Sequence, residues 1–149
     1  MVPLRESLVQ AITIDRVPYA FGDEAPNWLG EPAGRSEGGL ARYLCDLELW
    51  VSPERRGAFR KAAIVSIGVP SKIEDGWSIP LEWQAASLAP LFPVLVGSLV
   101  VQPDRLTIDG HYAPPFGVVG LLLDRGLLSI AAHRTARWFL GKVADVLEG

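Results

Sequence analysis

The stretch WSIPLEWQAAS, residues 77–87, carries the clearest structural signal in this chain of 149 residues. Its apolar side chains Trp77, Ile79, Leu81 and Trp83 recur at every second position. Because successive side chains of a β-strand point to opposite faces of the sheet, this alternation is typical of a strand that is buried on one face. We therefore predict a strand here whose four apolar side chains face a core.

The same period of two recurs on both sides of this stretch. Residues 41–51, 58–69 and 105–112 alternate in the same way, and the segments that connect them have turn composition. Residues 92–102 are apolar on both faces of the predicted strand, which favours a central position in the sheet. Five consecutive strands with short connections predict an antiparallel meander over residues 41–112, and a strand nearer the N-terminus brings the predicted count to six. The alternating apolar positions are Tyr43, Cys45, Leu47, Leu49 and Val51, then Phe59, Ala63, Val65, Ile67 and Val69, and finally Leu106, Ile108 and Tyr112.

The first forty residues divide into two parts. Residues 7–17 mix β-branched and apolar side chains, so we predict a strand there. Residues 18–39 are rich in proline and glycine, which favours turns and at most short helical pieces. Within them, DEAPNWL at residues 23–29 predicts one helical turn, with Trp28 and Leu29 covering the core.

A long helix is predicted over residues 117–147. Pro115 suits its first turn, where a missing N–H costs nothing. At about 1.5 Å per residue, a helix that runs from Gly117 to Glu148 spans roughly 48 Å, enough to cross a whole sheet. One face of it is apolar at helical spacing. The residues of that face are Leu121, Leu128, Ala132, Ala136, Phe139, Val143, Val146 and Leu147.

Charge and cysteine content exclude several classes of partner. The formal net charge of −3, with scattered basic residues, argues against a nucleic-acid-binding surface. Cys45 is the single cysteine, so the chain forms no internal disulfide and suits a reducing compartment. The N-terminal sequence MVPLRESLVQ lacks the basic-then-apolar layout of a signal peptide, so we expect a cytoplasmic protein. A homodimer is left open.

One uncharged stretch, residues 83–103, approaches the length of a membrane-spanning helix. Pro90, Pro93 and Pro103 would break a helix there, and strands joined by a turn explain the stretch better. We therefore expect no stable membrane insertion.

The residues and elements described so far resemble those of the START-like superfamily, also called SRPBCC, which includes polyketide cyclases and lipid-transfer domains. The resemblance covers residues 39–147 and implies an α+β helix-grip fold, in which a curved antiparallel sheet wraps around one long C-terminal helix. It also implies one domain over residues 1–149. The chain departs from the family in two respects, because residues 18–39 are rich in proline and glycine and expected to be irregular where the family has two short helices, and because six strands are counted where a seventh is common. The segments that carry it are RKAAIVSIGVP, WSIPLEWQA, LFPVLVGSLVVQP, LTIDGHYAPPFGVVG and WFLGKVADVL.

In this family a cavity between helix and sheet holds apolar small molecules, and the superfamily has no shared catalytic motif to carry over. We therefore expect the corresponding residues of this chain to line such a cavity. The expected lining residues are Trp77, Trp83, Phe92, Tyr112, Leu121, Arg125, Leu128, Ser129 and Ala132.

Arg125 is the one charged residue among them. At about 100° per residue, it falls near the centre of the apolar helix face. A buried guanidinium needs a partner. The partner is either a carboxylate such as Glu82, or solvent at the helix end, or the polar head of a ligand. Ser129 and His133 follow at i+4 and i+8 and extend this polar strip.

The sequence contains no catalytic or cofactor motif. His111 and His133 are the only histidines, too few for a histidine-rich metal site, and His111 with Asp109 fits a solvated strand face. Cys45 is expected to be a buried, inert thiol. The leading hypothesis is a cofactor-free domain that binds an apolar or amphipathic small molecule. The alternatives are a cyclase or dehydratase that uses Arg125, His133 or Tyr112, and an interaction protein with a filled core.

Overall fold

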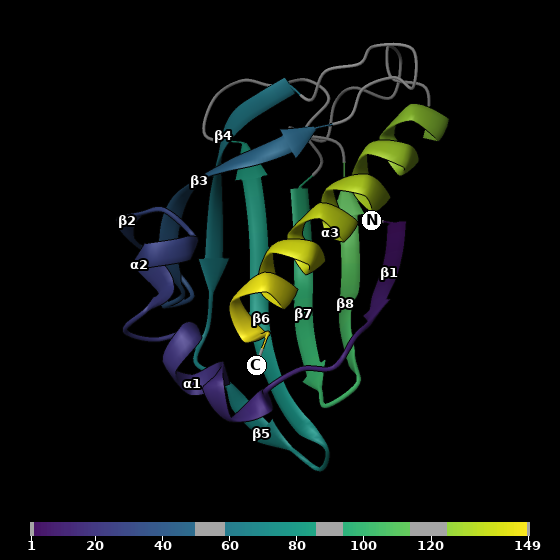
Figure 1. Cartoon of the computed structure of the whole chain (residues 1–149). Coiled ribbons are helices and arrows are strands. Elements are labelled where there is room, and N and C mark those ends of the chain that lie inside the picture. Colours follow the sequence, from purple (N-terminus) through teal and green to yellow (C-terminus); the bar gives the residue numbers. More distant parts are fainter. Residues whose placement is uncertain (1, 50–58, 86–93, 114–124, 149) are drawn as a thin grey trace.

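The computed structural model describes residues 2–49, 59–85, 94–113 and 125–148 (Figure 1). Within these ranges the chain forms an eight-stranded antiparallel sheet and one long C-terminal helix, α3 (Arg125–Leu147), which packs against it. This confirms the predicted antiparallel sheet and C-terminal helix, an α+β arrangement. The strands are β1 (Val2–Val9), β2 (Glu31–Arg35), β3 (Ala41–Leu49), β4 (Phe59–Ile67), β5 (Ser71–Ile73), β6 (Gly76–Ala85), β7 (Val94–Gln102) and β8 (Arg105–Ala113).

The sheet has the order β1-β8-β7-β6-β4-β3-β2, and β5 pairs with the free half of β6. The first strand therefore pairs with the last one, and β7 lies in the interior of the sheet, as its apolar composition predicts. Pro80 lies within β6 where this strand changes partner, because β5 pairs with residues 76–78 and β4 with residues 81–85. A proline, which lacks an N–H, is tolerated at such a gap in the ladder.

The predicted alternation places the core side chains correctly along β6 and β8. Ile79, Leu81 and Trp83 are buried, as are Leu106 and Ile108. Val69, which was predicted to face the core at the end of the strand over residues 58–69, is instead 83% exposed. The reason is that β4 ends at Ile67, so Val69 follows the strand and lies in the connection to β5.

The predicted strand over residues 7–17 is wrong in its position. The structure forms β1 at Val2–Val9 instead, and the chain then leaves the sheet for a 3-10 turn at Ile14–Arg16. The alternation of β1 is hidden in the sequence because Glu6 occupies a position on the same face of the strand as Leu4.

Two strands were missed entirely, so the count of six becomes eight. All five residues of β2 are exposed, and β5 contains only Ser71–Ile73. A strand that buries no apolar face carries no period-two signal, and β2 lies at the edge of the sheet.

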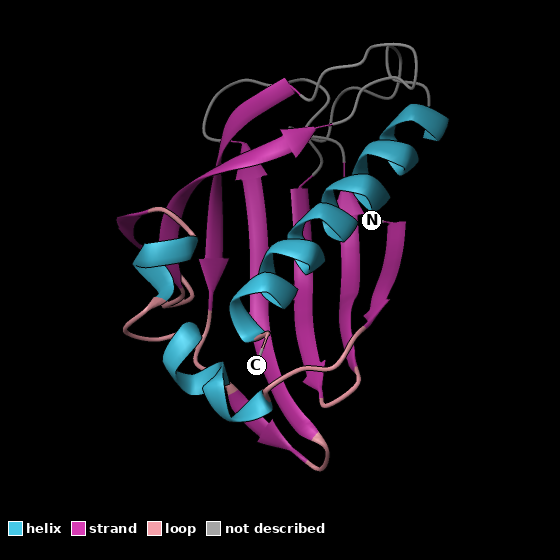
Figure 2. Ribbon diagram, in the orientation of Figure 1, coloured by secondary structure: helices cyan, strands magenta, loops and turns pink. Residues whose placement is uncertain are grey.

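Two short helices occupy the segment rich in proline and glycine, α1 (Val17–Ala20) and α2 (Ala25–Trp28). The helical turn predicted for residues 23–29 is confirmed as α2. Leu29 is buried and Trp28 packs against the core, also as predicted. Both helices and α3 lie on the same side of the sheet (Figure 2).

Helix α3 crosses the sheet diagonally (Figure 1). The predicted helix began at residue 117, and residues 117–124 lie outside the described part of the chain. The C-terminal end of α3 is fixed to the chain after β1, because the Thr13 N–H donates to the Leu147 carbonyl at 3.0 Å. Its buried residues include Ala132, Ala136, Phe139, Val143 and Leu147, which confirms the predicted apolar face over this range.

None of the helices in the described ranges is long and apolar enough to cross a membrane.

Candidate functional site

The face of the sheet toward α3 carries one continuous row of large side chains. Strand register aligns Tyr43, Val65, Trp83, Leu95 and Tyr112 across β3, β4, β6, β7 and β8. All five side chains are buried. Since neighbouring strands lie about 4.8 Å apart, Trp83 and Tyr112 are separated by about 10 Å across the sheet. The structure therefore brings these two predicted residues to one place.

A pair of glycines lies next to this row. Gly97 of β7 pairs with Gly110 of β8, and each is two residues from the row along its strand. A Cβ on Gly97 would lie 2.4 Å from the Asp109 carbonyl oxygen, so the two backbones approach too closely for a side chain here. The sheet thus presents a strip without side chains between larger apolar ones.

The residues of α3 that face the sheet change in size along the helix. Between residues 129 and 136 the buried side chains are small, whereas most of those from residue 139 onward are large. The small buried residues are Ala131, Ala132, Thr135 and Ala136, and the buried residues further along are Phe139, Leu140, Val143, Ala144 and Leu147. Within the described side chains, the bulky contacts of α3 therefore begin at Phe139.

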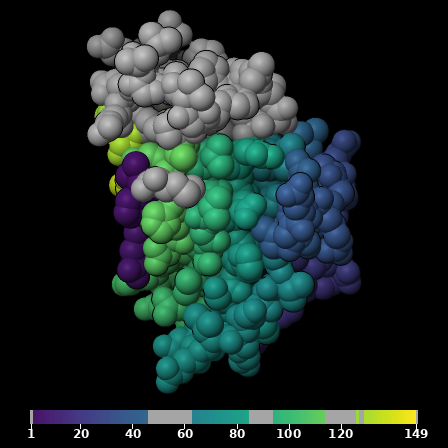
Figure 3. All heavy atoms as spheres, turned by 180° about the vertical axis from the view of Figure 1, so that it is seen from behind, coloured from purple at the N-terminus to yellow at the C-terminus, as the bar shows by residue number. Residues whose placement is uncertain are grey.

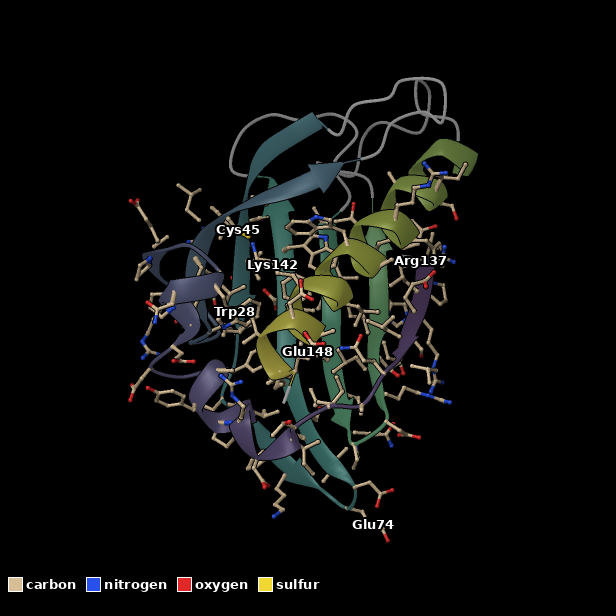
Figure 4. The ribbon with its side chains drawn as sticks, in the orientation of Figure 1. Trp28, Cys45, Glu74, Arg137, Lys142 and Glu148 are labelled. Carbon is tan, nitrogen blue, oxygen red and sulfur yellow. The ribbon has the colours of Figure 1, made fainter. Side chains whose placement is uncertain are left out.

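The position of the small helix residues follows from two contacts with β1. His133 Nδ1 lies 2.6 Å from one Glu6 carboxylate oxygen, and Arg137 Nε donates to the other oxygen at 2.9 Å. Figure 4 shows Arg137 on the side of α3 toward β1. Glu6 pairs with Ile108 of β8, two residues from Gly110. The helical turn between His133 and Arg137 thus lies over the part of the sheet that contains the glycine strip.

Two buried polar atoms in this region have no hydrogen-bond partner within the described residues. They are Nε1 of Trp83 and Oγ1 of Thr135. The Trp83 ring packs against Phe139 at a centroid distance of 5.5 Å, and Thr135 lies one helical turn before Phe139. A buried polar group is normally satisfied, so each of these two atoms calls for an explanation.

Three other predicted lining residues are placed as follows. Ala132 of α3 is buried, and Ser129 of the same helix is half-buried about one turn earlier. Trp77 lies six residues from Trp83 along β6, about 20 Å away at 3.3 Å per residue. Its half-buried ring stacks under Lys72 Nζ at 5.8 Å, at the far end of the sheet. Trp77 is therefore not brought together with Trp83.

The side chains of the four remaining predicted lining residues are not described. Phe92 and Leu121 lie outside the described residues. Arg125 and Leu128 belong to the first turns of α3, and the description covers their backbone alone.

The expectation that Glu82 could be the carboxylate partner of a buried Arg125 is wrong. Its neighbours Leu81 and Trp83 are buried toward α3, so Glu82 lies on the opposite face of the sheet. On that face it lines a hollow of about 450 Å³ together with Arg42 and Ser66. Figure 3 shows this face of the molecule from behind, where side chains of β6, β7 and β8 lie at the surface.

Glu6 was missed by the sequence analysis, although it holds the only described contacts of His133 and Arg137 with β1. Its carboxylate is 10% exposed, because it lies on the face of β1 that α3 covers. A carboxylate two residues from the buried Leu4 is the signal that could have found it. His133 was expected to extend a polar strip along the helix, and its ring instead contacts the sheet edge.

Three other groups singled out in the sequence lie away from the row of large side chains or outside the contacts described above. His111 and Asp109 are exposed on the outer face of β8. Cys45 is buried. The described residues contain no group of three or more His, Cys, Asp or Glu side chains that could hold a metal ion.

Comparison of this chain with protein-family models, with curated proteins and with solved structures finds no match in any of the three.

Proposed function

We propose that this chain binds one apolar or amphipathic small molecule between the sheet and α3, in a helix-grip fold of the START-like kind. The site has the glycine pair Gly97 and Gly110 as its floor, Trp83 and Tyr112 as its walls, and the helical turn around Ala132 as its roof. The observation that carries the proposal is that both layers contribute small residues to the interface between them, Gly97 and Gly110 from the sheet and Ala131, Ala132 and Ala136 from α3. Ligand sites in proteins are concave, mostly apolar and provided with few polar groups.

The order of elements supports the helix-grip part of the proposal. Two short helices, α1 and α2, stand between β1 and the rest of the sheet, and the long helix is last. The START-like family has this order. The proposal places the protein in the cytoplasm, where Cys45 stays reduced, and it is compatible with a monomer or a homodimer.

The rival explanation is a filled core, in which small residues only allow α3 to approach the sheet closely. The two explanations predict opposite effects of a larger side chain at Ala132. In a filled core, Ala132→Phe overpacks and destabilises the protein by about 1–3 kcal/mol. In a ligand cavity the added ring occupies the cavity, so stability changes little and binding is lost.

The experiment titrates the wild type, Ala132→Phe and Ala144→Phe with a fluorescent apolar probe. Ala144 is the matched control, since it is equally buried but lies among the large residues of α3, about 18 Å further along the helix axis at 1.5 Å per residue. We expect one probe per wild-type chain, no probe binding by Ala132→Phe, and a lower melting temperature only for Ala144→Phe. Equal destabilisation of both variants without probe binding by the wild type would favour the filled core.

A second candidate function is an enzyme of the cyclase or dehydratase type, favoured by the contact between His133 and Glu6. A carboxylate oxygen at 2.6 Å from Nδ1 fixes the orientation of the imidazole ring. This arrangement suits a general base beside an apolar site. Glu6→Gln would then lower turnover of a bound polyketide-like substrate without loss of probe affinity. Unchanged turnover would mean that the contact only holds β1 and α3 together.

A further inference from the structure

We propose that the bound molecule carries an uncharged oxygen, of the ketone, ester or alcohol kind, which Trp83 and Thr135 recognise inside the site. This inference rests on the proposed function and names the polar group of the ligand. It starts from the two buried polar atoms that have no partner within the described ranges, Trp83 Nε1 and Thr135 Oγ1.

Comparable side chains elsewhere in the chain are satisfied. Trp28 Nε1 donates to the Ala20 carbonyl oxygen at 2.7 Å, and the Thr107 hydroxyl shares a hydrogen bond with Ser7 at 3.0 Å. Trp83 is 2% exposed and Thr135 is fully buried, so both are more deeply enclosed than Trp28. Trp28 and Thr107 thus have partners, whereas the more deeply buried Trp83 and Thr135 have none among the described residues.

Both unpartnered groups lie beside the same ring. Trp83 of β6 contacts Phe139, and Thr135 precedes Phe139 by four residues, so it lies on the same side of α3. They therefore approach one region from opposite layers, Trp83 from the sheet and Thr135 from the helix. Within the described residues no hydrogen bond joins the two, and in the proposal each contacts the same oxygen of the ligand.

The chemistry of these groups selects the ligand atom. An indole N–H donates only, whereas a hydroxyl donates or accepts. A carbonyl oxygen has two lone pairs and can accept one hydrogen bond from each. Neither Trp83 nor Thr135 carries charge, so the pair cannot neutralise a buried carboxylate, which would need a cationic partner. The pair therefore favours a neutral oxygen over an acid.

Both atoms are almost completely covered in this structure. A ligand reaches them only when the side chains that cover them move aside. Binding then replaces apolar contacts of these two atoms by hydrogen bonds, and this gives the ligand oxygen its contribution to affinity.

The test compares a long-chain ketone with the alkane of the same length, each displacing a fluorescent apolar probe from the wild type, Trp83→Phe and Thr135→Val. The variants keep the ring or the shape of the side chain and remove the polar atom. We expect ketone affinity to fall about tenfold in each variant, because a net hydrogen bond of this kind corresponds to a factor of that order, while alkane affinity stays unchanged. Trp28→Phe is the control, since its indole is already satisfied, and it should leave the ratio of ketone to alkane affinity unchanged.

Thr135→Val gives a second readout in the empty protein. Removal of a buried unsatisfied hydroxyl should raise the melting temperature, whereas Trp28→Phe, which breaks a hydrogen bond, should lower it. Equal losses for ketone and alkane in both variants, or no loss in either, would overturn the inference while leaving the proposed function intact. A long-chain fatty acid bound more tightly than the ketone would overturn the assignment of a neutral oxygen. Failure of the wild type to bind the probe, the ketone or the alkane would instead overturn the proposed function, and the inference with it.

Discussion

Phe139→Ala tests the packing of α3 against the sheet. The Phe139 side chain is fully buried and contacts two aromatic rings, Trp83 at 5.5 Å and Trp28 at 6.2 Å between centroids. Truncation of a buried phenylalanine costs about 3–5 kcal/mol, from lost transfer free energy and from the cavity that remains. At about 2–4 °C for each kcal/mol in a chain of this size, the melting temperature should fall by about 6–20 °C.

The assay is urea unfolding followed by circular dichroism, with calorimetry for the melting temperature. Ile130→Ala is the matched control, because Ile130 belongs to the same helix and is 42% exposed. The control should lose less than about 1 kcal/mol, since exposed side chains away from packed contacts contribute little. A loss below about 1 kcal/mol for Phe139→Ala, or losses of equal size for both variants, would refute the helix packing described here.

Three further predictions concern stability. Gly141→Ala should raise the free energy of unfolding by about 1 kcal/mol in urea titrations, because Gly141 lies inside α3 and an added Cβ would meet nothing within 4 Å beyond the adjacent residues and the backbone of its own helical turns; a loss would mean that this position is packed. Gly97→Val should lower the free energy of unfolding by more than about 2 kcal/mol, since its Cβ would meet the backbone of β8; a melting curve like the wild type would place β7 and β8 further apart. Glu6→Ala should cost about 1 kcal/mol and Arg137→Ala less than about 0.5, because the Glu6 carboxylate is nearly buried and the Arg137 side chain is 70% exposed; the reverse order would contradict the contacts of β1 with α3.

The central strands could be predicted from the sequence because burial on one face imposes a period of two. In β6 and β8 the apolar residues that this period selects are buried, apart from the half-buried Trp77 at the start of β6. The same reasoning predicted the face of α3 that contains Ala136 and Phe139, since helical spacing has its own period.

The edges of the sheet could not be predicted in this way. Strand β2 is exposed at every residue and forms because its backbone completes the ladder of β3. Strand β1 places Glu6 where an apolar residue was needed to complete the pattern. Both strands are selected by tertiary contacts, which the local pattern does not contain.

The candidate site was predictable only in part, for a related reason. Trp83 and Tyr112 were found because each belongs to the apolar phase of its strand. Trp77 shares that phase but lies at the far end of β6, and phase alone says nothing of position along a strand. Thr135 was missed because a threonine on an apolar helix face resembles any small core residue until its hydroxyl is seen without a partner.

Native mass spectrometry of the purified chain tests the central proposal most directly. The protein is purified without detergent, and the mass of the intact chain is compared with its mass after denaturation. The account predicts a species with one apolar small molecule per chain, which an organic solvent extracts and which an Ala132→Phe variant lacks. A wild-type chain that carries the mass of the polypeptide alone, and that fails to take up an apolar probe or a long-chain ketone when these are added, would contradict it.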